Sequence, residues 1–100
     1  MDKLILKNCL GFEWDKGNRN KNWEKHTVLE WECEQAFFNK PFLLYEDVKH
    51  SLSEKRWYAI GKTNADRKLF VVFTIRNRFV RIISARDASR RERLIYEEAE

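Results

Sequence analysis

Two histidines in this chain could take up and release protons near neutral pH. His26 follows Lys25, and His50 lies in the segment Asp47-Val48-Lys49-His50-Ser51. An imidazole with an ordinary pKa of about 6.5 can act as a base or an acid at that pH. Each residue is equally a candidate for a hydrogen-bonded structural histidine, and the residues alone leave both readings open.

The last third of the chain gathers cations that could bind phosphate. Residues 76–93 carry seven arginines against Asp87 and Glu92, a net charge of +5, whereas the other 82 residues carry 13 basic and 14 acidic side chains. All ten lysines lie outside this window. A guanidinium group binds phosphate through two hydrogen bonds and stacks on bases, which an ammonium group does not. The pattern favours a nucleic-acid surface, most readily one for RNA, over an ordinary solvated face.

The sequence shows no grouping of metal ligands. Glu30, Glu32 and Glu34 are expected to spread around a helix, so we expect no two-metal nuclease site and no cofactor. Cys9 and Cys33 lack the spacing of a zinc site. Because no export signal or membrane-spanning stretch is visible, we expect a cytoplasmic protein with free thiols and no membrane contact.

Two helices are predicted in the first forty residues. Asp15 is a suitable N-cap for a helix over about 16–26. Thr27 and Glu30 have the spacing of a capping box, which predicts a second helix over about 28–38 with Leu29, Cys33, Ala36 and Phe37 toward the core.

Strands dominate the rest of the chain. Branched and aromatic residues predict strands at 42–46, 57–63, 69–76 and 79–85, the last three forming an antiparallel meander. Phe12 and Trp14 suggest an additional edge strand. Ser89 and Glu92 form a second capping box before a C-terminal helix in which Leu94 and Ile95 can dock. The prediction is a single α+β domain over residues 1–100, with two N-terminal helices, a curved antiparallel sheet of about four strands and a short C-terminal helix.

Arg81 has an unusual place in the predicted strand at 79–85. Two-residue alternation puts it on one face with Phe79 and Ile83, so either it pairs with an acidic group or that face opens into a cleft. Arg86 is expected just past the strand end. Residues 68–73 share the aromatic pattern of an RNA-recognition motif, but its glycine and its element order are missing, so core packing is favoured there.

Several segments, taken in order, carry a family resemblance. They include Phe12-Glu13-Trp14-Asp15, Lys25-His26, Phe37-Phe38, Lys49-His50-Ser51, Glu54-x-Arg56, Phe73-Thr74-x-Arg76, Arg81-Ile82-Ile83-Ser84-Ala85-Arg86 and Glu92-Arg93-x-x-Tyr96-Glu97. Together they resemble the BrnT family of bacterial toxins over about residues 11–97. One departure is visible, because Thr27 stands where the family usually has glycine; since Thr27 is also a sound N-cap, we expect the helix to begin there.

The resemblance implies a RelE-like fold and an RNA-cleaving toxin that arrests translation. Because the acidic residues do not cluster, we expect the cleavage to be metal-independent. It also implies a BrnA-like antitoxin with a ribbon-helix-helix domain, through which alone the toxin would meet operator DNA. His26 or His50 would handle proton transfer, and Lys25, Arg81 and Arg86 would bind the scissile phosphate. Arg56 and Arg76, from the family motif, and Arg90 and Arg91, from the arginine-rich window, would bind RNA.

Two other functions compete with this one. The first is a non-catalytic RNA- or DNA-binding module, and the second is a protein whose basic face docks an acidic partner. The catalytic reading requires that the guanidinium groups converge on one pocket. If these groups pointed into bulk solvent, or were each held by a carboxylate, the catalytic reading would fail and only a folded scaffold would remain.

Overall fold

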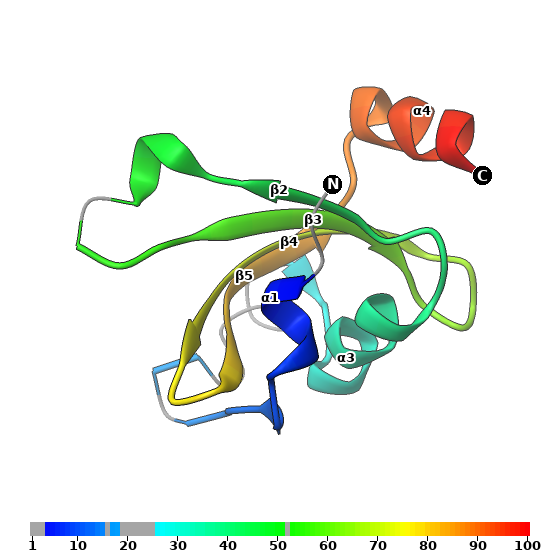
Figure 1. The fold of residues 1–100 in the computed structure, drawn as a ribbon. Helices are drawn as coiled ribbons and strands as arrows, with labels where there is room; N and C mark the ends of the chain where they lie inside the picture. Colours follow the sequence, from blue (N-terminus) through cyan, green and yellow to red (C-terminus); the bar gives the residue numbers. More distant parts are fainter. Residues whose placement is uncertain (1–3, 16, 19–25, 52) are drawn as a thin grey trace.

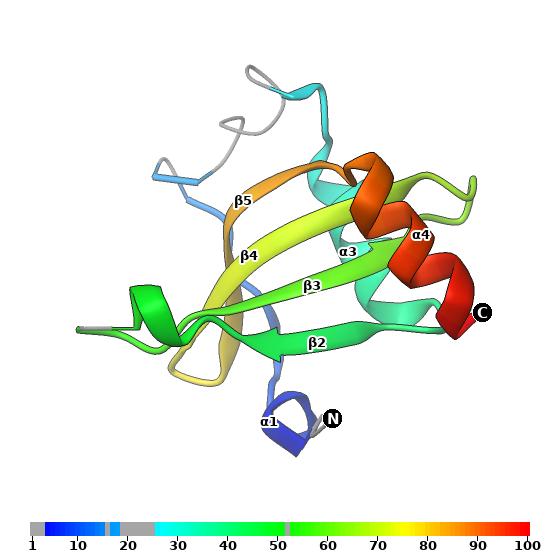
Figure 2. The same cartoon turned by 90° about the horizontal axis from the view of Figure 1, so that it is seen from above.

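Five strands form one sheet in the part of the chain that the computed structural model describes, which is residues 4–15, 17–18, 26–51 and 53–100. The described elements are α1 (Leu4–Lys7), β1 (Gly11–Phe12), α3 (Glu30–Phe38), β2 (Leu43–Glu46), η1 (Val48–His50), β3 (Trp57–Lys62), β4 (Lys68–Arg76), β5 (Phe79–Asp87) and α4 (Arg90–Ala99). The strand order is β1-β5-β4-β3-β2, and Figure 2 shows the four longer strands side by side.

The predicted α+β class and the antiparallel meander are confirmed. Strands β2 to β5 pair antiparallel with their neighbours. The sheet is nevertheless mixed, not wholly antiparallel, because β1 adds a fifth strand that pairs parallel with β5. The edge strand suggested by Phe12 is therefore present, although it covers only Gly11 and Phe12 and does not reach Trp14.

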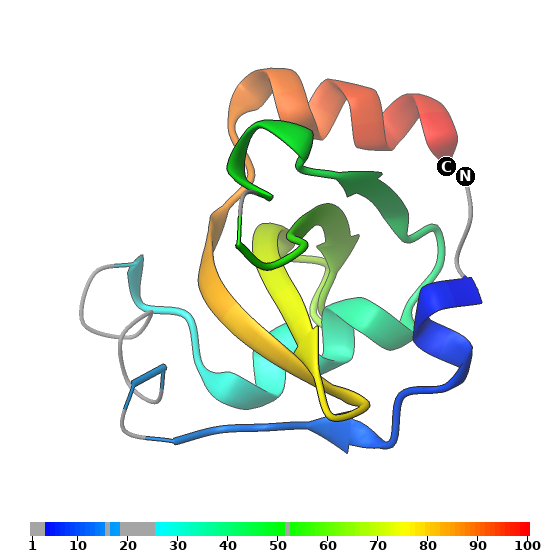
Figure 3. The same ribbon diagram turned by 60° about the vertical axis from the view of Figure 1, so that its left-hand side comes forward.

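Helices cover the two faces of the sheet unequally. Figures 1 and 3 show α1 and α3 on one side of the strands and α4 on the other. Alternate residues of β4 (Leu69, Val71 and Phe73) are buried in the core with Cys33 and Ala36 of α3, as period-two alternation requires. The opposite side, which carries Phe70, Val72, Thr74 and Arg76 of β4, is called the open face below.

A glycine lets α3 approach the sheet closely. A Cβ added at Gly61 of β3 would lie 2.6 Å from the backbone oxygen of Ala36. No real Cβ tolerates that distance to a backbone atom, so only glycine fits where strand and helix backbones meet.

A β-bulge changes which side chains of β5 reach the open face. Val72 lies opposite Ser84 and Phe73 lies opposite Ile82, so Ile83 has no partner on β4. The extra residue reverses the alternation. Arg81 therefore shares the open face with Ser84 and Arg86 across the bulge. The predicted shared face of Arg81 and Phe79 is confirmed, because these residues lie opposite Thr74 and Arg76 of β4. Arg86 also lies within β5 and not beyond its end.

The predicted start of α3 is wrong by two residues. The helix begins at Glu30 with Leu29 as N-cap, and Glu32 reaches back to accept a hydrogen bond from the Leu29 N–H at 3.0 Å. Thr27 instead has a positive φ of 55°, whereas an N-cap needs extended backbone. Its hydroxyl donates to the His26 carbonyl at 2.6 Å. The predicted end is confirmed, because α3 stops at Phe38 before Asn39.

The capping box of α4 is confirmed, but the docking residue is not the predicted one. The Ser89 hydroxyl accepts from the Glu92 N–H at 3.2 Å, and Glu92 accepts from the Ser89 N–H at 2.8 Å. Leu94 and Ile95 are 53% and 41% exposed, whereas Tyr96 is fully buried. Its hydroxyl donates to the Pro41 carbonyl at 2.6 Å, which ties α4 to the segment before β2.

The remaining predictions concern the first N-terminal helix, the cysteines and the absence of a membrane span. The helix over about 16–26 lies almost entirely outside the described residues, as does Lys25. The short α1 was not predicted. Both cysteines are free, as expected, and burial first of all raises the pKa of the Cys33 thiol to about 12. Within the described residues, every helix is too short or too polar to cross a membrane.

Candidate functional site

Three arginines meet at the end of the open face that is farthest from α4. Arg76 donates through Nε and Nη2 to the Glu54 carboxylate at 2.6 and 3.0 Å. The hydrogen bond from Arg76, and then the charges of Arg56 and Arg81, hold the pKa of Glu54 below its usual value. Thr74 of β4 lies opposite Arg81 and donates to the carbonyl of Lys55, the neighbour of Arg56, so the three arginines lie around one part of the open face.

Arg81 is held by two carboxylates. Its Nη1 donates to Asp15 at 2.6 Å and to Glu13 at 3.2 Å, and its Nη2 donates to Asp15 at 2.9 Å. The bond from Arg81 is the first cause that lowers the pKa of Asp15 to about 2. Of the two alternatives for Arg81, the structure shows the acidic pairing, which links β5 to the segment that follows β1.

His50 lies beside this arginine cluster and is oriented by a carboxylate. In η1, its Nδ1 lies 3.0 and 3.1 Å from the two oxygens of Asp47. The Asp47 N–H donates to the Arg56 carbonyl at 2.8 Å, which places the pair next to β3. The His50 side chain is 57% exposed, and within the described residues its Nε2 has no hydrogen-bond partner.

Asp47 was not nominated from the sequence, although a readable signal existed. It stands three residues before His50, a spacing that lets a carboxylate reach an imidazole across one helical turn. A carboxylate on Nδ1 fixes the tautomer that leaves Nε2 free to accept a proton.

The structure separates the two histidines. The carbonyl of His26 accepts a hydrogen bond from Arg67 Nη2 at 3.4 Å, just before the start of β4. His50 belongs with Arg56, which lies near the other end of that strand because the neighbouring Lys55 carbonyl accepts from Thr74 at 2.7 Å. The two imidazoles therefore do not share a site.

The remaining nominated arginines form a second group beside α4. Arg86 donates to Glu92 at 2.8 and 3.0 Å, and its guanidinium lies 4.2 Å from the centre of the Phe70 ring. Burial, which alone would raise the pKa of Glu92, is outweighed by this bond and by Ser89, so the pKa is lowered. Arg90 and Arg91 are exposed in the first turn of α4.

The guanidinium groups thus converge at two places and not on a single pocket. Arg76, Arg81 and Arg86 are each held by a carboxylate. That arrangement favours structural ion pairs in the free protein, and an RNA phosphate would have to displace those carboxylates. Arg56 differs, because no carboxylate of the described residues forms an ion pair with it. The catalytic roles of these arginines stay predictions.

The arrangement on the open face has the parts that phosphodiester chemistry needs. It combines an oriented imidazole with nearby cations, which can move a proton and stabilise negative charge. Within the described residues, no three histidine, cysteine or acidic side chains gather as a metal site would require.

Comparison with known proteins identifies the family. No curated protein matches the chain. A family model described as the ribonuclease toxin, BrnT, of type II toxin–antitoxin systems matches residues 14–92. Because this match spans most of the sequence, the chain belongs to the BrnT family of ribonuclease toxins, which implies RNA as its substrate and an antitoxin as its partner.

Proposed function

We propose that this protein is a metal-independent endoribonuclease that cleaves RNA on the open face, with His50 as the group that moves the proton. The observation that carries the proposal is the His50–Asp47 pair, at 3.0 Å, beside Arg56. Family membership supports the substrate. The side-chain geometry supports the mechanism, because an oriented base and cations suffice for cleavage at a 2′-hydroxyl.

The proposed reaction uses the RNA's own 2′-hydroxyl as nucleophile. Nε2 of His50 takes the hydroxyl proton while O2′ forms a bond to phosphorus. The bond from phosphorus to the 5′-oxygen breaks, which leaves a 2′,3′-cyclic phosphate and a 5′-hydroxyl. Water protonates the departing oxygen, since His50 stands at an exposed site. The Asp47 carboxylate stabilises the imidazolium that forms.

Arg56 is the proposed first cation on the phosphate. Arg76 and Arg81 join it when the phosphate takes the place of Glu54 and Asp15. This exchange is expected to be strongest in the transition state, where an extra negative charge gathers on the phosphate oxygens. Each guanidinium group presents a planar fork of donors that suits phosphate as well as carboxylate.

The finer biological statements follow from the family and stay proposals. We infer that cleavage arrests translation and that a BrnA-like antitoxin neutralises the toxin. The same antitoxin would carry the DNA-binding domain that represses the shared operon.

An RNA-cleavage assay in excess EDTA tests the proposal. Wild type is expected to cleave a labelled single-stranded RNA in the chelator, and His50→Ala is expected to lose about 10²-fold or more of the rate. His26→Ala is the comparison, since it removes the other imidazole. Loss of cleavage in His26→Ala with full activity in His50→Ala would move the base to His26. Cleavage that stops in EDTA and returns with Mg²⁺ would contradict metal independence.

A non-catalytic nucleic-acid-binding module is the second candidate. The observation that favours it is the exposure of Arg90 and Arg91 in the first turn of α4, where they could hold phosphates without taking part in cleavage. In that case the protein would shift a labelled RNA in a binding assay and leave it intact under all conditions, with or without divalent ions.

A further inference from the structure

Three aromatic rings form a row across the open face. Tyr45 of β2 and Tyr58 of β3 stack with ring centres 5.1 Å apart and an interplanar angle of 22°. Tyr58 and Phe70 of β4 stack in the same way at 5.3 Å and 27°. The guanidinium of Arg86 on β5 continues the row over the Phe70 ring. The row therefore crosses four strands and ends on a cation.

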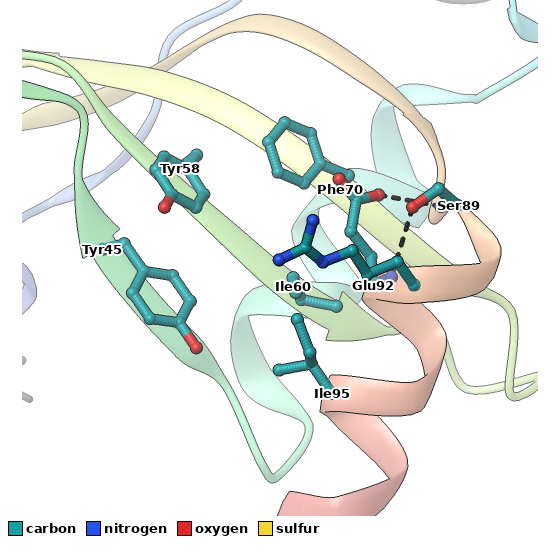
Figure 4. A pocket seen from close by; sticks show the side chains of 8 residues that line it. Tyr45, Tyr58, Ile60, Phe70, Ser89, Glu92 and Ile95 are labelled. Atoms are coloured by element: carbon teal, nitrogen blue, oxygen red, sulfur yellow. Dashed lines mark hydrogen bonds between the residues drawn. The ribbon is translucent and has the colours of Figure 1, made fainter. Parts of the chain in front are cut away.

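A cavity of about 460 Å³ lies between this row and α4. Figure 4 shows Tyr45, Tyr58 and Phe70 along the sheet side of the cavity, with Ile95 and Glu92 facing them from α4. The volume is in the range of sites that hold small organic groups. All three rings are only partly buried, so their surfaces remain accessible.

The chemistry of the cavity combines flat aromatic surfaces with positive charge. Arg91 of α4 lines it. No ion pair within the described residues involves Arg91, so its guanidinium is available to an anion. Proteins that bind single-stranded nucleic acid use this combination, with bases stacked on rings and phosphates held by arginines. An apolar protein segment would gain nothing from the cation.

The cavity also adjoins the proposed cleavage site. Arg56 comes directly before β3, two residues from Tyr58, and in extended backbone that interval is about 7 Å. An RNA molecule whose scissile phosphate binds Arg56 therefore brings a neighbouring nucleotide to Tyr58.

We propose that this cavity is a subsite for one nucleobase of single-stranded RNA, next to the phosphodiester that is cut. The base contacts the parts of the Tyr58 and Tyr45 rings that remain exposed, Ile95 covers its edge, and Arg91 binds a flanking phosphate. The inference rests on the proposed ribonuclease function and makes it more specific. Only an unpaired base can leave its neighbours and enter, so the substrate is single-stranded and duplex RNA is excluded.

The test measures the affinity of a fluorescently labelled ten-nucleotide RNA that 2′-O-methyl groups protect from cleavage. Tyr58→Leu keeps apolar volume and removes the aromatic ring, and it is expected to weaken binding about tenfold. Trp31→Leu is the matched control, because Trp31 is an exposed aromatic residue on α3, across the sheet, and no loss is expected there. Wild type is expected to bind the same sequence much more weakly as a duplex.

A second comparison locates the base. An abasic nucleotide at the position that occupies the cavity should weaken binding to wild type by the same factor as Tyr58→Leu, and the two changes together should cost no more than either alone. If Tyr58→Leu does not fold, Arg91→Gln serves instead. Arg91 is exposed, so this substitution should not disturb the fold. It should lower by about one the number of counterions released when RNA binds, as read from the salt dependence of the affinity.

The possible outcomes distinguish a failure of the proposed subsite from a failure of the proposed ribonuclease function. Unchanged RNA affinity in Tyr58→Leu and Arg91→Gln, in a protein that still needs His50 for cleavage, would overturn the subsite and leave the ribonuclease intact. Loss of antitoxin binding in these variants with full RNA affinity would assign the cavity to the protein partner and overturn the subsite. A wild type that neither binds nor cleaves RNA would remove both proposals.

Discussion

Arg81 donates two hydrogen bonds to the carboxylate of Asp15, at 2.6 and 2.9 Å, and so joins the strand β5 to the segment after β1. This pairing holds the pKa of Asp15 at about 2, so the carboxylate is fully charged at neutral pH. An RNA phosphate that binds Arg81 must therefore compete with an anion already in place.

Replacing Arg81 is expected to reduce cleavage. Arg81→Ala removes a cation that stabilises the transition state, and kcat/KM on a labelled RNA should fall by roughly 10²–10³. Arg78→Ala is the matched control, because Arg78 is exposed on the β4–β5 turn and its Nε donates to the Asn8 carbonyl. An Arg81→Ala protein that cuts RNA as fast as wild type would remove Arg81 from the mechanism.

Removing the carboxylate that competes for Arg81 should strengthen the binding of RNA. Asp15→Asn keeps the shape of the side chain and removes its charge, so the affinity for a non-cleavable RNA is expected to rise a few-fold, with a steeper dependence on salt. Binding titrations at two salt concentrations measure both. A fall in affinity would show instead that Asp15 positions Arg81 for RNA and does not compete with it.

Acid should destabilise the fold through the same pair. The folded-state pKa of Asp15 is lowered from 3.8 to about 2, so its contribution to stability is complete above about pH 4 and is lost as the pH falls toward 2. Urea denaturation between pH 7 and pH 2 should show a smaller acid loss in Asp15→Asn than in wild type. Equal losses in the two proteins would place the acid sensitivity elsewhere, for instance at Glu54 or Asp87, whose pKa values are also lowered, chiefly by bonds from Arg76 and Arg67.

The carboxylate beside the base should matter for rate and not for folding. Asp47→Asn keeps a hydrogen-bonding group near Nδ1 of His50 but no longer stabilises the imidazolium, so kcat should fall about tenfold. The loss should be smaller than in buried triads, because this pair is exposed and water can replace part of the interaction. Thermal melting is expected to be nearly unchanged. A fully active Asp47→Asn would contradict the role given to the pair.

Thr27 is a site where a substitution should stabilise the protein. Its φ of 55° is a conformation that a β-branched residue rarely adopts and that glycine adopts freely. Thr27→Gly should raise the free energy of unfolding by about 1 kcal/mol, after the extra chain entropy of glycine is subtracted. Thr27→Ala, which also loses the hydroxyl but keeps a Cβ, should gain much less. Equal effects of the two changes would show that backbone conformation is not the cause.

The sequence predicts best what short-range patterns determine. Residue type and turn chemistry predicted the meander, and the Ser89–Glu92 spacing predicted the start of α4. The start of α3 was missed because the capping spacing at Thr27 cannot reveal a positive φ. Leu94 and Ile95 were expected to dock, whereas the buried Tyr96 docks because its hydroxyl reaches Pro41.

The candidate site depends on strand register, which a single sequence does not contain. The row of Tyr45, Tyr58 and Phe70 requires that β2, β3 and β4 pair in one particular alignment. Residues 68–73 were interpreted as core, and this holds for one side of β4 only, since Phe70 faces the open side. The carboxylate partner of Arg81 was left open because Asp15 is 66 positions away along the chain.

The unpaired Ile83 lets two residues an odd number of positions apart share one face of β5. Arg81 and Arg86 lie opposite Thr74 and Phe70 on the open face although five positions separate them, whereas unbroken alternation would put such a pair on opposite faces. Without Ile83, the residues Ser84, Ala85 and Arg86 would keep their partners on β4 and their faces. Descendants of this chain can therefore lose this one residue without turning a side chain over, and the interval from Arg81 to Arg86 can shorten by one.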